Sequence, residues 1–353
     1  MIRKLSFAAA GILCLAMLAA SRAEDAKPGS GTLAVVSWGG SYQEAQRKAY
    51  FQPFEKETGI RVVEGTGPQI EKTRAQVQSG HPEFDIASTN QAFNLIGIEQ
   101  GLWLPIDYRY FAPADLQAMP EVMRQKYAVG TISYAEGLAI SQAAFAAGGA
   151  QPNSWADAWD VKKFPGKRAL PWCDIATYPL PEAALLADGV PAEKLYPLDI
   201  PRAIAKLKQL APDVVWWHDI NQAGQMLTSG EAVMSMAPSN RIQTLIDAGA
   251  PLKIVWNQNR YTFDVWYVLK GAPDADNAMR FIAFASRPES QARMAKLGGY
   301  GPTNPRALAL IDDATARKLP TYADNFKLEF QKNEEWWKNN RQKWVEACTA
   351  ALY

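Results

Sequence analysis

Histidine is scarce in this chain of 353 residues, and the two that it has form no catalytic pattern. His81 lies in a Gly-His-Pro turn, and His218 follows two tryptophans. Neither shows the spacing to serine, cysteine or carboxylate that nucleophilic catalysis or a zinc site needs. The sequence leaves paired carboxylates for glycoside hydrolysis open, but no spacing favours them. These observations argue against an enzyme, and they indicate no bound metal and no cofactor.

Cysteine is also scarce, and the charge is nearly balanced. Of three cysteines, one lies in an apolar N-terminal run, and Cys173 and Cys348 remain. In an oxidising compartment these two either pair or stay as separate, partly buried thiols. Without the three basic residues of the N-terminal run, the 37 basic residues fall to 34 against 36 acidic ones, a net charge of −2. That balance does not suit a nucleic-acid-binding protein.

The first 23 residues have the pattern of a secretory signal peptide. Arg3 and Lys4 precede an apolar run over residues 7–20, which ends in Ser21-Arg22-Ala23. The run is too short for a confident membrane span, and small residues flank the expected cleavage site. We therefore expect cleavage after Ala23, export and a periplasmic location.

The mature chain opens with a short apolar run at 33–36, which predicts a buried strand. Gly39-Gly40 permits a sharp turn, and Ser41 with Glu44 predicts a helix that starts with a capping box. Ligands of open α/β sheets bind where strands end and helices begin. At this edge we expect three side chains, Trp38, Ser41 and Tyr42.

Strand and helix patterns alternate along the rest of the chain and predict an α/β fold. A first unit ends near residue 135, and a second covers 136–263. Strand-like runs at 127–141 and 261–269 are expected to cross between them. We therefore predict two lobes, one made of 24–135 with 264–353 and the other of 136–263. The tryptophan-rich tail at 325–352 predicts a helix docked on the first lobe.

Five motifs in one order resemble the polyamine-type extracellular solute-binding proteins of ABC importers, and the likeness covers nearly all of the mature chain. The resemblance implies a type II periplasmic-binding-protein fold with two crossover strands at the hinge. It also implies a monomer that holds a small amine between its lobes and delivers it to a membrane permease, without nucleic acid. The motifs are Trp38 with the helix ending in Phe-Glu-Lys-Glu-Thr-Gly-Ile at 54–60, Phe-Asp-Ile-Ala-Ser-Thr at 84–89, Leu-Thr-Ser-Gly-Glu-Ala at 227–232, and the segments 281–289 and 299–304.

The resemblance further implies a set of ligand-binding residues. Asp264 matches the family's amine-binding aspartate, Trp38 its opening aromatic residue and Asp174 a further carboxylate. Carboxylates pair with ammonium groups, and aromatic faces add cation–π attraction. The alternatives are a structural ion pair for Asp264, a core position for Trp38 and a solvated loop for Asp174.

Other polar and aromatic side chains follow the strand at 84–87 or lie in the expected crossovers. Glu136 could pair an amine, and Tyr134 could form a wall of the cleft. For the residues after the strand, helix capping is the alternative role. The full set is Ser88, Thr89, Asn90, Ser133, Tyr134, Glu136 and Trp266.

The sequence also departs from the family pattern. Gly39 or Gly40 stands where relatives carry an acid, Thr177 replaces a second carboxylate, and Arg241 lies close to a proline at an aromatic position. Fewer acids and an added arginine argue against a long polycation, since arginine is suited to bind a carboxylate. Asp264 and Arg241 would together suit a zwitterion such as 4-aminobutyrate, unless Arg241 only bridges structure.

A receptor for ferric ions or anions on the same fold ranks lower. The chain has no Tyr-Tyr pair for iron, although helix starts at Ser41 and Ser88 could bind an anion. The function expected first is therefore capture of a polyamine-like solute, with a zwitterion as the alternative.

Overall fold

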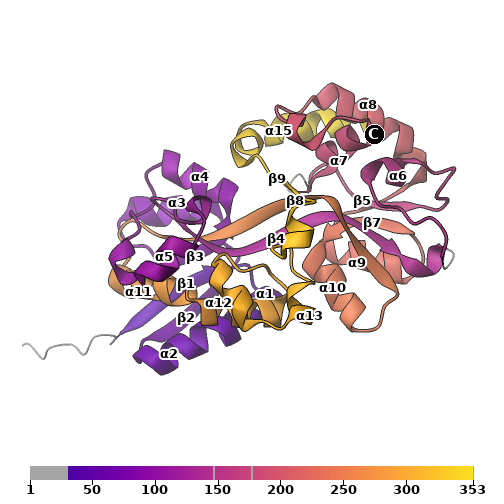
Figure 1. The fold of residues 1–353 in the computed structure, drawn as a ribbon. Coiled ribbons are helices and arrows are strands. Elements are labelled where there is room, and N and C mark those ends of the chain that lie inside the picture. The colour runs from indigo at the N-terminus through magenta and orange to yellow at the C-terminus, as the bar shows by residue number, and fades with distance from the viewer. Residues whose placement is uncertain (1–30, 146–147, 176–177, 353) are drawn as a thin grey trace, which may run out of the picture.

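The molecule has two lobes (Figure 1). Each lobe is built around its own large cluster of buried apolar side chains. The computed structural model describes residues 31–145, 148–175 and 178–352. The predicted signal peptide and its cleavage site lie outside the described residues, as does Thr177. The expected α/β fold with two lobes is confirmed.

The first lobe is built on three parallel strands whose apolar side chains are covered by helices. Leu33 and Val35 are almost fully buried, as a strand with both faces covered requires. Gly59 ends the second helix in a left-handed conformation, as expected. The strands are β1 (Thr32–Ser37), β2 (Arg61–Thr66) and β3 (Ile86–Asn90), and the helices are α1 (Gly40–Gln46), α2 (Gln52–Thr58), α3 (Ile70–Ser79), α4 (Gln91–Glu99), α5 (Pro113–Ala118), α11 (Ala275–Ala285), α12 (Pro288–Gly298), α13 (Asp313–Ala316) and α14 (Ala323–Phe326).

The second lobe repeats this arrangement in the middle of the chain. Trp155 and Trp217 are fully buried in its core. Its strands are β5 (Arg168–Pro171), β6 (Val214–Trp217) and β7 (Met234–Pro238), and its helices are α6 (Trp155–Trp159), α7 (Leu180–Ala187), α8 (Ile200–Leu210), α9 (Ile220–Thr228) and α10 (Ser239–Asp247).

Two long antiparallel strands, β4 (Val129–Ser141) and β8 (Leu252–Val268), pass from one core to the other. Their register shifts twice, between Gly130 and Ile132 and between Glu136 and Leu138, so the pair is bent rather than flat. The described strands form one sheet in the order β2-β1-β3-β8-β4-β7-β5-β6. The two expected crossovers are thus confirmed, while the exact lobe boundaries stay a prediction.

The C-terminal segment crosses between the lobes a third time, which the sequence did not predict. β9 (Phe330–Gln331) pairs with β8, and α15 (Glu334–Leu352) then lies beside α8 of the second lobe (Figure 1). Trp337 and Trp344 are buried in the second core, and Cys348 forms a disulfide with Cys173. The sequence placed this helix on the first lobe; its apolar side chains complete the second core, and its first turns also contact α4 of the first lobe, where Lys338 pairs with Glu99.

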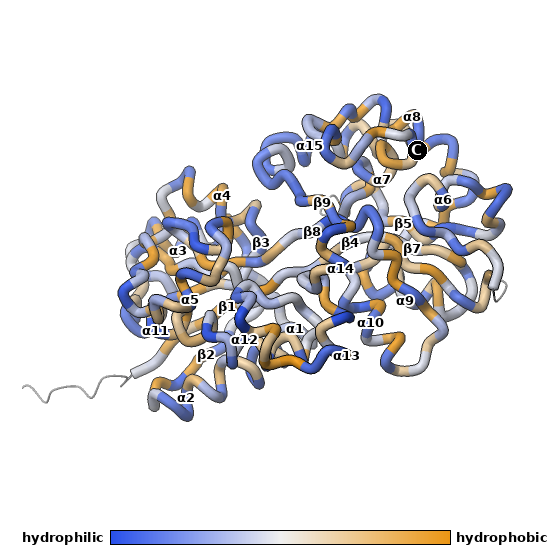
Figure 2. The backbone as a smooth tube through the Cα atoms, viewed as in Figure 1, coloured by the Kyte–Doolittle hydropathy of each residue, from blue (hydrophilic) through white to orange (hydrophobic). Residues whose placement is uncertain are grey.

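The apolar segments of the chain lie mainly inside the two lobes. Figure 2 shows apolar segments gathered inside the lobes, for example around β7 and α9, and hydrophilic segments at the outer turns. Among the described helices, none combines the length and the apolar character that crossing a bilayer requires.

Candidate ligand-binding site

A cavity of about 340 Å³ lies beside the two crossover strands, with walls from both lobes. A second cavity of about 400 Å³ adjoins it between α1 and α12 on one side and α9 and α10 on the other. Sizes of this order fit small organic ligands. The first cavity is lined by Trp38, Tyr42, Asn90, Ile132, Tyr134, Glu136, Tyr178, Ile220, Pro238, Asn240, Arg241, Asp264 and Tyr300.

Trp38 follows β1, is 41% accessible as a whole residue and lines the cavity. The helix after it does not begin as expected. Gly39, with a φ of 80°, is the residue that precedes α1, and its N–H donates to the Gln43 side chain at 3.0 Å. The capping box of Ser41 and Glu44 is therefore wrong, because the glycine's positive φ starts the helix earlier. Ser41 is exposed and lines the second cavity instead.

Tyr42 links the wall of the cavity to the interior of the first lobe. Its hydroxyl lies 3.1 Å from the Ser88 hydroxyl, and its ring meets the Tyr300 ring edge to face at 5.3 Å. Tyr42 borders both cavities. Ser88 itself is fully buried, so its hydroxyl orients Tyr42 rather than lining the cavity.

Asp264 is the buried carboxylate of this site. It lies on β8, 4% accessible, opposite Asn90 of β3. Trp38 Nε1 donates to its Oδ2 at 3.0 Å, and the Tyr134 hydroxyl donates to its Oδ1 at 3.3 Å. Burial raises the pKa of Asp264 to about 6, although these two hydrogen bonds oppose the shift. Among the described residues no cation forms an ion pair with it, so the structural ion pair considered above is absent there.

Arg241 lies in the first turn of α10, on the opposite lobe, and lines both cavities. Its Nη1 donates to Asn221 Oδ1 at 3.1 Å. Its charge acts on Tyr300, where burial raises the pKa to about 12 and the guanidinium opposes that rise. Within the described part of the chain Arg241 has no acidic partner. The cavity thus has a carboxylate on one side and a guanidinium on the other.

Glu136 lines the cavity but is already paired. Arg260 of β8 binds Glu136 Oε2 through two nitrogens, at 2.5 and 3.2 Å. The same guanidinium binds Glu182 Oε1 at 2.9 Å. Both glutamates and the arginine are almost fully buried. Glu136 thus already has a cationic partner, which it shares with Glu182, and its pairing with a ligand amine stays a prediction.

Several other sequence-predicted residues lie outside the cavity. Thr89 and Ser133 are fully buried, and the Ser133 hydroxyl contacts the Tyr261 hydroxyl at 2.8 Å. Trp266 is fully buried against Phe281, so its assignment to the ligand site is corrected to a core position. Asp174 is exposed and does not line the cavity.

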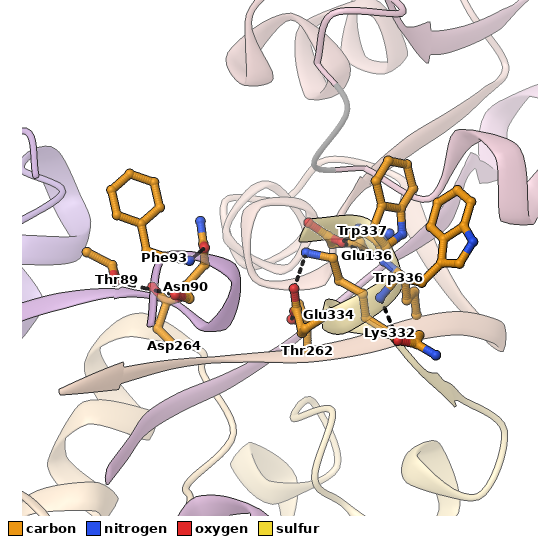
Figure 3. A network of polar contacts seen from close by, with 12 residues as sticks. Thr89, Asn90, Phe93, Glu136, Thr262, Asp264, Lys332, Glu334, Trp336 and Trp337 are labelled. Carbon is orange, nitrogen blue, oxygen red and sulfur yellow. Dashed lines mark hydrogen bonds and ion pairs between the residues drawn. The ribbon is translucent and has the colours of Figure 1, made fainter. Parts of the chain in front are cut away.

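Asn90 does line the cavity, at the end of β3. Its side chain also caps α4 by accepting from the Phe93 N–H at 3.1 Å. Figure 3 shows Asn90 and Thr89 above Asp264, with Thr262 further along the same strand. The capping role that the sequence offered as an alternative is therefore present in the same residue.

Six lining residues were not in the predicted set: Ile132, Tyr178, Ile220, Pro238, Asn240 and Tyr300. Asn240 precedes Arg241 just after β7, and Tyr178 follows β5, so both obey the rule that ligands meet the carboxyl ends of strands. That rule was a usable signal for these two. Ile132 and Ile220 carry no polar group that would have distinguished them from core residues.

The chain is similar to known solute-binding proteins over almost its whole length. Residues 49–323 match the family described as bacterial extracellular solute-binding protein. The gamma-aminobutyric acid-binding protein of Pseudomonas aeruginosa is 37% identical over 94% of this chain and 92% of its own length.

Solved structures agree with this family. An ABC transporter substrate-binding protein from Bradyrhizobium japonicum has 37% identity and a TM-score of 0.83, covering 92% of this chain and 99% of its own. A GABA receptor has 32% identity and a TM-score of 0.82, covering 91% and 98%. The spermidine/putrescine-binding protein PotD of Streptococcus pneumoniae, at 18% identity, shares the fold alone.

These relatives are solute-binding proteins rather than enzymes, and an extracellular family implies a periplasmic location. The signal-peptide cleavage expected after Ala23 stays a prediction. The chain belongs to the family of bacterial extracellular solute-binding proteins and is the substrate-binding component of an ABC transporter.

Proposed function

We propose that this protein captures a small zwitterion, 4-aminobutyrate or a similar amino acid, between its lobes. The observation that carries the proposal is the placement of Asp264 and Arg241, each without an oppositely charged partner among the described residues, in the walls of one cavity. Asp264 would accept the ligand ammonium, and Arg241 would bind its carboxylate through charge-assisted hydrogen bonds. Two relatives that bear the name of this ligand support the same choice.

Aromatic rings surround the expected position of the methylene chain. Trp38 and Tyr134 lie beside Asp264, while Tyr178 and Tyr300 lie nearer Arg241. Their faces exclude water and attract the ammonium group. This combination suits a short, flexible chain with opposite charges at its ends.

A polyamine fits the site less well. A diamine needs a carboxylate for each ammonium, and the described cavity wall offers only Asp264 free of a cation. Glu136 already pairs with Arg260, which it shares with Glu182, and Asp174 does not line the cavity. Arg241 would repel a cation in the position where a second acid is required.

The expected mechanism is a shift between open and closed arrangements of the lobes. A ligand that touches Asp264 and Arg241 together contacts both lobes only when they approach, so its binding free energy favours closure. The bent crossover strands are the place where this motion would occur. We propose that the closed monomer then delivers the solute to its membrane permease.

Calorimetry with four matched ligands tests the charge requirement. We expect binding of 4-aminobutyrate, and binding at least tenfold weaker for butylamine, butyrate and putrescine, because each lacks one of the two charges or carries the wrong one. A charge-assisted hydrogen bond contributes about 1.5–3 kcal/mol, which corresponds to roughly ten- to hundredfold in affinity. Preferential binding of putrescine would refute the zwitterion proposal.

Two substitutions assign the ends of the ligand. Arg241→Gln should weaken 4-aminobutyrate binding and leave the weak binding of butylamine unchanged. Asp264→Asn should also weaken 4-aminobutyrate binding, but it should leave the weak binding of butyrate unchanged. The matched control is Arg287→Gln, which removes an exposed ion pair with Glu57 far from the cavity. Unchanged affinity in Arg241→Gln would exclude a role for Arg241 in binding.

A further inference from the structure

The connection from β5 to α7 forms part of the second-lobe wall of the cavity. The structure describes its residues 172–175 and 178–179. Tyr178 lines the cavity and is 7% accessible, and its ring packs edge to face on Trp217 at 5.0 Å. Its N–H donates to the Ile175 carbonyl at 3.3 Å. One local hydrogen bond of this kind does not by itself fix the position of a loop residue, so contacts from elsewhere in the fold are needed to hold Tyr178 in place.

One stripe of α15 holds both ends of this connection. Trp337, Arg341, Trp344 and Cys348 follow a spacing of four, three and four residues, which places them on one face of a helix. Cys348 forms the disulfide with Cys173 at the β5 end, and Trp344 is fully buried between these attachments.

Arg341 adds a second attachment at the β5 end. Its Nη2 donates to the backbone carbonyl of Asp174 at 3.2 Å. Because the acceptor is a backbone atom, this contact fixes the path of the chain rather than the Asp174 side chain. The Asp174 side chain is exposed and takes no part in this contact.

The other end of the stripe fixes the start of α7. Trp337 Nε1 donates to Glu182 Oε1 at 2.8 Å, and Tyr196 donates to the same oxygen at 2.6 Å. Glu182 also binds Arg260, whose guanidinium reaches Glu136 on the crossover strand. Figure 3 shows Trp337 beside Glu136. The connection that carries Tyr178 is thus tied to α15 on both sides and to the hinge strands.

We infer that α15 is a positioning helix for the ligand site, and that Cys348, Arg341 and Trp337 act on ligand affinity through Tyr178. This inference rests on the proposed function for its ligand. Binding is weakened when a loop must be ordered at the moment of binding, and an attachment made beforehand removes that cost. Tyr178 touches the ligand, whereas the α15 residues and Cys173 are positioning residues.

Affinity measurements on single and combined variants test whether α15 acts on binding through Tyr178. We expect about tenfold weaker 4-aminobutyrate binding for Tyr178→Ala, and about threefold or greater weakening for Cys173→Ser with Cys348→Ser, measured well below the unfolding temperature. Removing the disulfide in the Tyr178→Ala background should cause no further loss, because both changes act through one side chain. The inference would be overturned if removing the disulfide weakened binding as much in the Tyr178→Ala background as in the wild type. It would also be overturned if removing the disulfide left the dissociation constant unchanged.

Arg341→Gln provides a milder variant that keeps the disulfide, and it should weaken binding in the same Tyr178-dependent way. Phe54→Leu, in the core of the first lobe, is the control for lost stability alone and should leave the dissociation constant unchanged.

Hydrogen exchange in the ligand-free protein separates this inference from the proposed function. The amides of residues 172–175 and of Tyr178 should exchange at least tenfold faster without the disulfide, while those of β1 should not. Equal exchange in this connection would overturn the positioning role, whatever the ligand. If the wild-type protein failed to bind 4-aminobutyrate, the proposed ligand would be wrong. The exchange result would still show whether α15 fixes the connection from β5 to α7.

Discussion

The indole Nε1 of Trp38 donates a hydrogen bond to Asp264 Oδ2 at 3.0 Å, although the two residues are 226 positions apart in sequence. Trp38 as a whole residue keeps 41% of its surface accessible and lines the cavity. Trp38 therefore orients the buried carboxylate and presents an aromatic face beside it. This pair places an anionic acceptor and a cation-attracting ring at one end of the proposed ligand.

Asp264→Asn should stabilise the ligand-free protein while it weakens ligand binding. The pKa of Asp264 in the folded protein is about 6, above its ordinary value of 3.8, so the folded state holds the proton more tightly than the unfolded state. The wild-type protein therefore loses stability as pH rises from about 4 through 6. Between pH 4 and pH 8, the free energy of unfolding of the variant should rise relative to that of the wild type by up to about 3 kcal/mol. Denaturant unfolding of both ligand-free proteins at these two pH values measures this gain. A stability difference that does not grow with pH would contradict the cost of ionising Asp264.

Affinity for 4-aminobutyrate should fall at acidic pH. The ammonium requires an ionised Asp264, so affinity should be constant above pH 7 and about tenfold weaker at pH 5 than at pH 8. Calorimetry between pH 5 and pH 8 tests this, and near pH 6 the heat should depend on the buffer because binding releases a proton. A flat profile would show that Asp264 does not bind the amine.

Trp38→Phe should move this pH profile. The substitution keeps an aromatic ring but removes the N–H, which is the strongest of the contacts that lower the pKa of Asp264. The midpoint of the affinity profile should therefore shift above pH 6, with the largest loss of affinity near neutral pH. A weaker affinity at every pH with the same midpoint would mean that only the packing of the ring was disturbed.

Arg260→Gln should destabilise the protein strongly. It leaves Glu136 and Glu182 buried without their shared cation, and breaking a buried ion pair typically costs about 3–5 kcal/mol. Denaturant unfolding measures the loss. Arg287→Gln, which breaks only an exposed pair, should change stability far less. Equal effects of the two substitutions would contradict the structural role of Arg260.

The order of strands and helices and the two crossovers were predictable because they depend on local periodicity. The resemblance to the solute-binding family pointed to Asp264 and Trp38, and both line the cavity. The roles of Glu136 and Asp174 were not predictable, because each depends on a partner far along the chain: Arg260 lies 124 residues from Glu136, and Arg341 lies 167 residues from Asp174. A single sequence records no such pairings.

The helix start at Gly39 and the placement of α15 show two further limits. Ser41 and Glu44 fit a capping box, but the positive φ of Gly39 decided where the helix begins. The stripe of tryptophans on α15 correctly predicted a buried face. Periodicity does not say which lobe an apolar face covers; here the face completes the second core, while the helix also contacts α4 of the first lobe.

The third crossing has a consequence for the order in which the molecule is completed. The second lobe is encoded in the middle of the chain, yet its core requires Trp337, Trp344 and Cys348 from the final helix. The first lobe likewise lacks α11 and α12 until late in synthesis. Neither half can finish its core until the C-terminal part of the chain is available. Both lobes therefore depend on this C-terminal part, and the Cys173–Cys348 disulfide joins its final helix to the second lobe.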